Sequence, residues 1–230
     1  MHKISLGFFA LNLLTLILFS IQGAEGTVPL RNTFHLRNST TLVISQGDIT
    51  KAYVAAIVHP ANKNLTMEAG ISTAIFNAAG IIRLSAACDA LIEEALGGIP
   101  ICDTGEALIT SSCNLASVGP IKHIIHTVGP DCKEVTDEAQ QNYLLIATYH
   151  NCLRLAEEHG ITSIAFPSIS TGNFAFPKER AAKNIWETFQ AYCMTPSFLR
   201  EIHCVFSEES DYKIMETAVL AAQLAQKKID

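Results

Sequence analysis

Short apolar runs alternate with longer amphipathic stretches along most of this chain. Two strand-like runs between Thr33 and Ser45 flank Asn38-Ser39 and are expected to form a hairpin. Five further runs have the length of buried strands: Ala56–Val58, Leu108–Thr110, His123–Val128, Ile164–Pro167 and Ile202–Phe206. Helical patterns separate these five runs. The alternation predicts an α/β fold, a three-layer α/β/α sandwich around a central mixed, mostly parallel sheet.

The helix boundaries are well marked in the second half of the chain. Asp137 and Gln140 have the spacing of a capping box before a helix from about Glu138 to Glu158. Gly160 suits the C′ position that follows this helix. Pro177 is expected in the first turn of the next helix.

The first residues form a separate segment. Met1-His2-Lys3 and the apolar run from Ile4 to Ile21 resemble an export signal, and small residues follow at Ala24-Glu25-Gly26. An uncleaved membrane anchor is the alternative, because about 18 apolar residues is near the lower limit for crossing a bilayer. We expect residues 1–26 to be a signal peptide and residues 27–230 a single domain. The mature protein is then exported, without a stable membrane partner once the leader is cleaved.

Composition limits the partners and the chemistry. The chain has 230 residues, 49% of them hydrophobic, which is enough for one sizeable core. A net charge of −6 and the lack of Lys and Arg clusters argue against a nucleic-acid partner. The seven cysteines form no CxxC pair, so we expect core thiols rather than a zinc site or a disulfide framework. His123 and His126 point to opposite faces of a strand and are expected to be structural.

Several motifs follow the predicted strands, and their order and spacing carry the functional signal. They are Gln46-Gly47-Asp48-Ile49-Thr50, Val58-His59-Pro60-Ala61-Asn62, Gly70-Ile71-Ser72, His126-Thr127-Val128-Gly129-Pro130 and Phe166-Pro167-Ser168-Ile169-Ser170-Thr171-Gly172-Asn173-Phe174. Over roughly residues 40 to 225 the chain resembles the macro domain family. It is most similar to MacroD-type hydrolases and bacterial O-acetyl-ADP-ribose deacetylases. The resemblance implies the macro domain fold and ADP-ribose, free or on a protein, as the partner.

The resemblance also implies ligand-binding residues. Asp48 matches an aspartate that accepts a hydrogen bond from the adenine amino group, and Asn62 matches an asparagine that contacts the distal ribose. Phe174 matches a bulky residue that closes over the ribose and diphosphate. Phe206 is a candidate for the adenine pocket, with a core position as the alternative. The predicted ligand-binding set is Asp48, Ile49, Asn62, Gly70, Ile71, Ser170, Thr171, Gly172, Asn173, Phe174 and Phe206.

Several positions depart from the family pattern. Glu68-Ala69-Gly70 stands where the family has three glycines, so a carboxylate near the diphosphate would weaken binding. Ala175 also replaces a glycine. Ser72 stands where the related hydrolases have an aspartate that helps to activate water, and a helix N-cap is its alternative role. His59 replaces an asparagine and is either a general base or a locally bonded structural histidine.

The sequence thus predicts an ADP-ribose-binding domain that hydrolyses ADP-ribosyl esters or O-acetyl-ADP-ribose. The candidate catalytic residues are Asn62, Ser72 and His59, and no metal or other cofactor is expected. A non-catalytic reader of ADP-ribose or ADP-ribosylated proteins is the alternative, which Ser72 and Glu68-Ala69 favour. A domain that kept the fold and lost the ligand is the third possibility.

Overall fold

A computed structural model describes residues 30–94, 102–195 and 197–226. The predicted leader, residues 1–26, lies outside the described residues. Seven strands of the described part form one sheet in the order β1-β2-β7-β6-β3-β5-β4. Their bounds are β1 Arg31–His35, β2 Thr41–Gln46, β3 Ala56–Pro60, β4 Ala107–Ser111, β5 His123–Thr127, β6 Ser163–Phe166 and β7 Glu201–Phe206.

The sheet is mixed and mostly parallel, as the sequence predicted. Strands β2, β7, β6, β3 and β5 run parallel to their neighbours in this order. The two outer strands are antiparallel, β1 to β2 in the expected hairpin and β4 to β5 at the other edge. The carboxyl ends of the five parallel strands therefore lie along one edge of the sheet, where ligands bind in open α/β folds.

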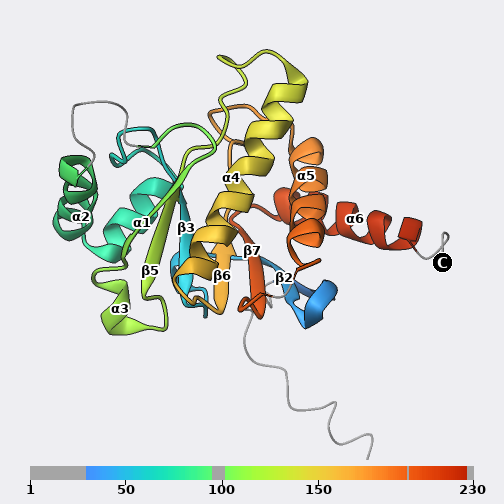
Figure 1. Ribbon diagram of the computed structural model, residues 1–230, viewed down its shortest axis with the longest axis horizontal. Helices are drawn as coiled ribbons and strands as arrows, with labels where there is room; N and C mark the ends of the chain where they lie inside the picture. Colours follow the sequence, from blue (N-terminus) through green and yellow to red (C-terminus); the bar gives the residue numbers. More distant parts are fainter. Residues whose placement is uncertain (1–29, 95–101, 196, 227–230) are drawn as a thin grey trace, which may run out of the picture.

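Helices cover both faces of the sheet and complete three layers (Figure 1). Helices α1 (Ile71–Ala79) and α2 (Ile81–Glu94) lie on one face, and α4 (Glu138–Glu158), α5 (Lys178–Tyr192) and α6 (Glu209–Gln226) lie on the other. The short elements are η1 Arg37–Ser39, η2 Ile49–Lys51 and α3 Leu115–Val118. Within the described residues no single helix has both the length and the hydropathy that crossing a membrane requires. Helices α1 and α2 have that length and hydropathy only when they are taken together, and they are bent by 102° relative to each other.

The helix signals in the sequence are largely confirmed. Asp137 is the N-cap of α4, and its side chain accepts a hydrogen bond from the Gln140 backbone N–H at 2.7 Å. Gly160 follows the C-cap with φ of 63°, which glycine adopts without strain. Pro177 is the N-cap of α5 and not a residue of its first turn, so that helix begins at Lys178.

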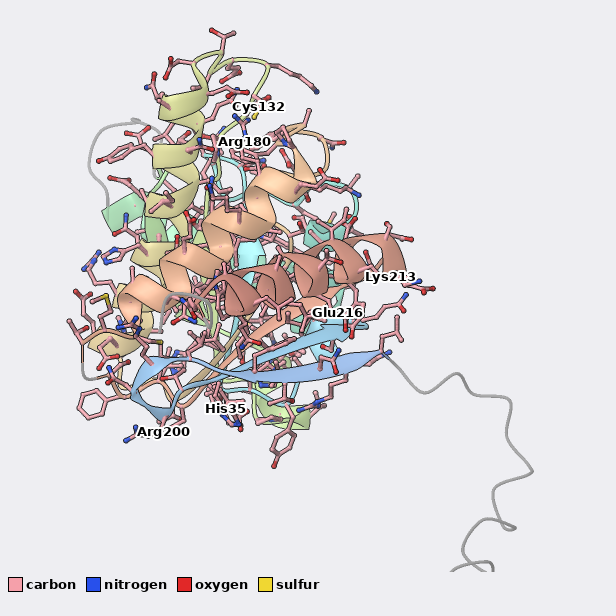
Figure 2. All side chains as sticks on the ribbon, turned by 90° about the vertical axis from the view of Figure 1, so that its right-hand side faces the viewer. His35, Cys132, Arg180, Arg200, Lys213 and Glu216 are labelled. Atoms are coloured by element: carbon pink, nitrogen blue, oxygen red, sulfur yellow. The ribbon has the colours of Figure 1, made fainter. Side chains whose placement is uncertain are left out.

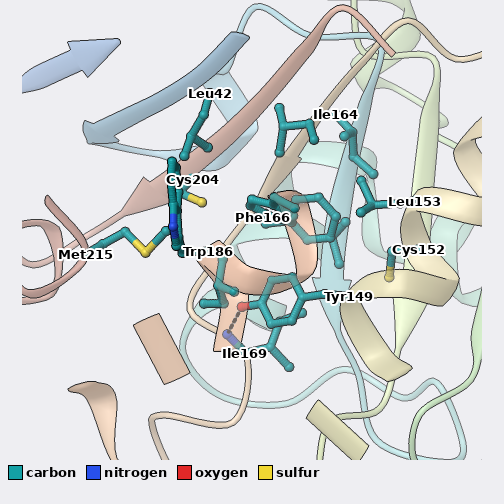
Figure 3. Close-up of a cluster of buried hydrophobic side chains, with 14 of the residues drawn as sticks. Leu42, Tyr149, Cys152, Leu153, Ile164, Phe166, Ile169, Trp186, Cys204 and Met215 are labelled. Atoms are coloured by element: carbon teal, nitrogen blue, oxygen red, sulfur yellow. Dashed lines mark hydrogen bonds between the residues drawn. The ribbon is translucent and has the colours of Figure 1, made fainter. Parts of the chain in front are cut away.

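Each face of the sheet has its own hydrophobic core. The core under α4, α5 and α6 includes Tyr149, Phe166 and Trp186 (Figure 3). The core under α1 and α2 includes Ile57 and Phe76. Alternate residues of the central strands enter the two cores, as the two-residue period of a strand requires. The buried cysteines are Cys88, Cys102, Cys152, Cys193 and Cys204, which confirms the expectation that most thiols are core residues.

Helices α5 and α6 pack against each other beside the β1–β2 hairpin (Figure 2). Lys178 at the start of α5 forms an ion pair with Asp211 of α6. Glu216 of α6 accepts a hydrogen bond from the side chain of Asn32 in β1. These contacts attach the last helix to α5 and to the hairpin at one end of the sheet.

Candidate functional site

The predicted ligand loops meet at the carboxyl edge of the sheet. The backbone N–H of Gly47 donates to the Phe206 carbonyl at 2.8 Å, which joins the end of β2 to the end of β7. The backbone N–H of Ala61 donates to the Thr127 carbonyl at 2.8 Å, which joins the ends of β3 and β5. We call residues 62–72, after β3, the first loop, and residues 168–174, after β6, the second loop.

Asp48 presents an ionised carboxylate at this edge. Its Oδ1 accepts hydrogen bonds from the backbone N–H of Thr50 at 2.9 Å and from the Thr50 hydroxyl at 2.7 Å, and Lys51 lies 3.4 Å from Oδ2. Burial alone would raise the pKa of Asp48, but the Thr50 bonds and Lys51 outweigh it and lower the pKa. The side chain is 41% exposed. Oδ2 can therefore still accept a hydrogen bond from a ligand.

Ile49 and Phe206 lie below the surface of this edge. Ile49 is 3% exposed and packs in the core under α1 and α2. Phe206 is 5% exposed and packs in the opposite core with Tyr212 and Met215 of α6. The side chain of Ile49 is thus a core side chain, and Phe206 has the core surroundings that were the alternative to an adenine contact.

Asn62 organises the first loop. Its Oδ1 accepts hydrogen bonds from the backbone N–H groups of Asn64 and Thr66, both at 3.1 Å. Its Nδ2 donates to the Thr66 hydroxyl at 2.7 Å and to Oε1 of Glu68 at 2.8 Å. All four contacts lie within the loop, so a ligand that takes the Asn62 amide must replace some of them.

The glycine replacements in the first loop do not strain the backbone. Gly70 has φ of 77° and ψ of −130°, a region open only to glycine, and serves as the N-cap of α1. Glu68 and Ala69 are not among the positive-φ residues. The fold therefore does not require the backbone freedom of glycine at positions 68 and 69. Ile71 opens α1 and is half-buried against the α1 core.

Ser72 lies inside α1, so its alternative assignment as N-cap is wrong. The side chain is 2% exposed, and its hydroxyl accepts a hydrogen bond from the Glu68 backbone N–H at 3.0 Å. The same hydroxyl lies 2.9 Å from Nε2 of His59. Ser72 thus links the first loop to a buried histidine.

His59 lies beneath the site and is fully buried. Its Nδ1 is 2.9 Å from Nδ1 of His126, its register partner in β5, and Nε2 of His126 is 2.8 Å from the Thr110 hydroxyl. Burial lowers the pKa of His59 to about 4. Burial, and then the charge of His59, lower the pKa of His126. Both rings are neutral at pH 7, and a neutral pair satisfies the Nδ1 contact when one ring donates and the other accepts.

The burial and hydrogen bonds of His59 fit a structural role better than a catalytic one. A general base must reach the proton that it removes, and no atom of His59 faces solvent. His59 and His126 also share one face of the sheet, whereas His123 lies near His159, the C-cap of α4, on the other face. The structure thus favours the structural alternative for His59 and confirms that His123 and His126 point apart.

Ser170 packs against the glycine of the His126–Pro130 motif. A Cβ atom at Gly129 would lie 2.1 Å from the Ser170 hydroxyl and 2.6 Å from Cγ2 of Ile169. Ser170 has φ of 65°, and its buried hydroxyl has no hydrogen-bond partner among the described residues. Two motifs 41 positions apart in the sequence (Gly129 and Ser170) therefore fit together because one of them lacks a side chain.

The second loop leaves a run of backbone donors free. Within the described residues the N–H groups of 170–174 donate to no carbonyl and no side chain. The loop is held from below, because the Tyr149 hydroxyl accepts from the Ile169 N–H and donates to the Pro167 carbonyl, both at 3.2 Å (Figure 3). Successive free amides just before a helix are the arrangement that binds phosphate groups.

The other residues of the second loop are more exposed. Gly172 and Asn173 are exposed, and Thr171 and Phe174 are half-buried. Thr171 donates to the Ser168 hydroxyl at 2.7 Å, and the Phe174 carbonyl accepts from the Cys132 N–H at 2.9 Å. Arg180 in α5 lies near Cys132 in the same region (Figure 2).

A run of free amides after β6, and a loop rich in polar side chains after the neighbouring strand β3, are the arrangement that the macro domain resemblance predicts. A macro domain family model matches residues 58–185, which include both loops. The chain belongs to the macro domain family.

Similar proteins and a solved structure support this membership. The O-acetyl-ADP-ribose deacetylase 1 of Pantoea vagans is 36% identical over 173 residues, 75% of this chain and 95% of that protein. The O-acetyl-ADP-ribose deacetylase of Salmonella typhimurium is 38% identical over 192 residues, 84% of this chain and 98% of that protein. The Oceanobacillus iheyensis macrodomain with ADP superposes with a TM-score of 0.77 at 34% identity, covering 86% of this macro domain chain and 98% of that one.

Three contacts that shape the site are not encoded in a sequence motif. Tyr149 is one residue of a long helix, and nothing in its surroundings marks it as the anchor of the second loop. His126 is structural, as expected, and its pairing with His59 depends on the β3–β5 register. The sequence predicts only that Glu68 weakens diphosphate binding, whereas in the structure its carboxylate also accepts a hydrogen bond from Asn62.

A separate groove of about 630 Å³ lies between α5 and α6. Trp186, Met194 and Ala222 are among the residues that line it. None of the predicted ligand-binding or catalytic residues lines this groove. It is distinct from the carboxyl edge of the sheet.

Proposed function

We propose that this macro domain binds ADP-ribose at the carboxyl edge of the sheet and hydrolyses ADP-ribosyl esters or O-acetyl-ADP-ribose. The observation that carries the proposal is the run of free N–H groups at residues 170–174, since a diphosphate is the ligand that such a run suits. The free amides at the start of α1, after Gly70, supply a second set of donors on the first loop.

The remaining parts of ADP-ribose are assigned to side chains at the same edge. Asp48 accepts a hydrogen bond from the adenine amino group through Oδ2, the oxygen that Thr50 does not engage. Asn62 exchanges its contacts with Asn64 and Thr66 for the distal ribose, and its amide nitrogen, which has two hydrogens, keeps its hydrogen bond to Glu68. Phe174, half-buried beside the free amides, covers the ribose and diphosphate. His59 and Ser72 hold the first loop from below.

The carboxylate of Glu68 does not prevent this binding. A carboxylate about 4 Å from a diphosphate costs on the order of 4 kcal/mol at an effective dielectric near 20, but only about 1 kcal/mol in water. Glu68 is exposed and its Oε1 is already engaged by Asn62, so the smaller figure applies. The third possibility, a domain that has lost its ligand, is therefore disfavoured.

The chemistry proposed is ester hydrolysis. Water attacks the acyl carbon, the bond from that carbon to the ribose oxygen breaks, and the products are ADP-ribose and the carboxylic acid. The site contributes by holding the diphosphate and ribose so that the ester and the water are close and oriented.

A non-catalytic reader is the second candidate function, and two observations favour it. Ser72 is buried and its hydroxyl is engaged by the Glu68 N–H and His59, so it does not act as a general base. The Asn62 amide is likewise engaged inside the loop. A reader would bind ADP-ribose and leave an ester intact.

Calorimetry separates these functions from loss of ligand binding. We would titrate ADP-ribose into the chain lacking residues 1–26 and then follow the conversion of O-acetyl-ADP-ribose to ADP-ribose by chromatography. Micromolar binding with turnover supports the hydrolase, and binding without turnover supports the reader. No binding at all would refute both.

We also propose that the domain is exported, because residues 1–26 resemble a signal peptide. Intact-mass measurement of the protein recovered from the culture medium or periplasm tests this. A mature chain that begins between Ala24 and Thr27 is expected. Full-length protein in the membrane fraction would instead support the anchor.

A further inference from the structure

Glu68 is fixed at three points, although it lies in an exposed loop. Its backbone N–H donates to the Ser72 hydroxyl at 3.0 Å. Its carbonyl accepts from the Thr73 hydroxyl at 2.6 Å. Its Oε1 accepts from Nδ2 of Asn62 at 2.8 Å. An exposed glutamate ordinarily has many rotamers, so these contacts define where its carboxylate lies.

The carboxylate remains available to water. Within the described residues its second oxygen, Oε2, has neither a hydrogen-bond donor nor a cation beside it, whereas Oε1 is held by Asn62. The residue is exposed, so water reaches Oε2. A carboxylate with one oxygen oriented by an amide and the other in contact with water has the geometry of a general base.

The other polar side chains of the site do not suit this task. His59 is fully buried, and Ser72 is 2% exposed with its hydroxyl engaged. Asp48 follows a different strand and is held by Thr50 and Lys51. Among these residues only Glu68 has a carboxylate directly beside Asn62, the residue assigned to the distal ribose.

We propose that Glu68 is the general base of the hydrolase, an inference that rests on the function proposed above. Oε2 accepts a proton from the attacking water as its oxygen bonds to the acyl carbon. The tetrahedral intermediate then collapses, the bond to the ribose oxygen breaks, and protonated Glu68 returns the proton to that oxygen. One water is consumed, and ADP-ribose and the carboxylic acid are released.

The test is Glu68→Gln in the purified protein, with O-acetyl-ADP-ribose turnover and ADP-ribose affinity measured on the same samples. Glutamine keeps the size of the side chain and can still accept from Asn62, but it is not a base. We expect kcat to fall at least tenfold, while the Kd for ADP-ribose stays the same or decreases because a negative charge is removed. Glu68→Asp keeps the carboxylate and should retain more turnover than Glu68→Gln.

Glu187→Gln is the matched control, since Glu187 is an exposed glutamate on α5. Its kcat and Kd should equal those of the wild type. Unchanged or faster turnover in Glu68→Gln, with intact binding, would overturn the assignment and leave the proposed function standing. Wild-type protein that binds ADP-ribose without hydrolysing the ester would overturn the assignment in favour of a reader. Wild-type protein that does not bind ADP-ribose would overturn the proposed function itself, and the assignment with it.

Discussion

The two ligand loops of this macro domain use their polar groups in opposite ways. In the second loop the N–H groups of residues 170–174 are free, and Tyr149 holds the loop from below. In the first loop both atoms of the Asn62 amide, and the hydroxyl of Ser72, are already engaged within the protein. The second loop is thus preorganised for an anion, whereas the first loop has to exchange hydrogen bonds when a ligand arrives.

Because of this difference, we expect one loop to determine mainly the affinity for ADP-ribose and the other to determine mainly the rate of hydrolysis. Preorganised donors bind an anion without the cost of ordering the loop, so the second loop is expected to supply most of the affinity. The first loop holds the residues assigned to the ribose and to the proton, so it is expected to contribute mainly to turnover. Changes in the two loops should therefore affect different measurements.

The largest effect is expected for His59→Asn, at the buried histidine below the first loop. The quantity affected is the free energy of unfolding at acidic pH. A histidine with an ordinary pKa of about 6.5 when unfolded and about 4 when folded is neutral in both states above pH 6.5. Below pH 6.5 only the unfolded state takes up the proton, so the wild type loses stability as pH falls towards 4. For His59 alone this loss is about 3 kcal/mol, and the variant should lack it.

Urea unfolding of both proteins at several pH values between 7 and 4 measures this difference. His35→Asn, at an exposed position of β1, is the control and should follow the wild-type curve. Parallel curves for the wild type and His59→Asn would show that the buried histidine pair does not couple to acid. The same variant also tests catalysis, since preserved or raised turnover excludes His59 as a base.

The second loop should be most sensitive at Gly129. In Gly129→Ala the new Cβ would meet Ser170 and Ile169 at less than 3 Å, so the second loop must shift. Overpacking of this kind costs roughly 1–3 kcal/mol. We expect a lower melting temperature and an ADP-ribose Kd raised at least tenfold. Gly119→Ala, where no atom lies within 4 Å of the added Cβ, is the control, and equal effects in the two variants would contradict the packing argument.

Asn62→Ala probes the first loop from the ligand side. It removes the amide that organises the loop and, under the proposed function, contacts the distal ribose. Turnover of O-acetyl-ADP-ribose should fall more than tenfold. Asn64→Ala changes an exposed neighbour that contributes only its backbone N–H to these contacts, and it should retain turnover. Wild-type turnover in Asn62→Ala would refute its assignment.

The smallest effect is expected just after the second loop, at Ala175. This residue has φ of 55°, where an L side chain costs roughly 1–2 kcal/mol, whereas glycine costs unfolded-state entropy of about 0.4–1 kcal/mol. Ala175→Gly should therefore stabilise the domain by about 0.5–1 kcal/mol in thermal unfolding. Ala191→Gly, in the last turn of helix α5, should destabilise it by up to about 1 kcal/mol. A loss of stability in both variants would show that Ala175 is not strained.

The strands and the main helix boundaries could be predicted from sequence because they depend on nearby residues. The ends of each predicted apolar run lie within two residues of the ends of a strand. The cap at Asp137 and the helix stop at Gly160 are local signals. The antiparallel direction of β4 could not be predicted. It depends on pairing with β5, whose residues are separate in the chain, and no periodicity within Leu108–Thr110 encodes it.

The site was predictable as a set of loops but not as a set of contacts. Asp48, Asn62 and the second loop were found because a motif marks each of them. The pairing of His59 with His126 depends on the register of two parallel strands, and the contact of Glu68 with Asn62 depends on the path of the loop between them. Such contacts join residues whose spacing in sequence says nothing of their distance.

The two cores, one on each face of the sheet, attach the two ligand loops to separate parts of the domain. The first loop is anchored by Leu65 and Ile71 in the α1 core, and the second by Ile169 and Phe176 in the α4 core. Substitutions in separate, non-contacting clusters act nearly independently. Substitutions in the core under α1 and α2 are therefore expected to disturb the first loop and to leave the position of the second loop unchanged.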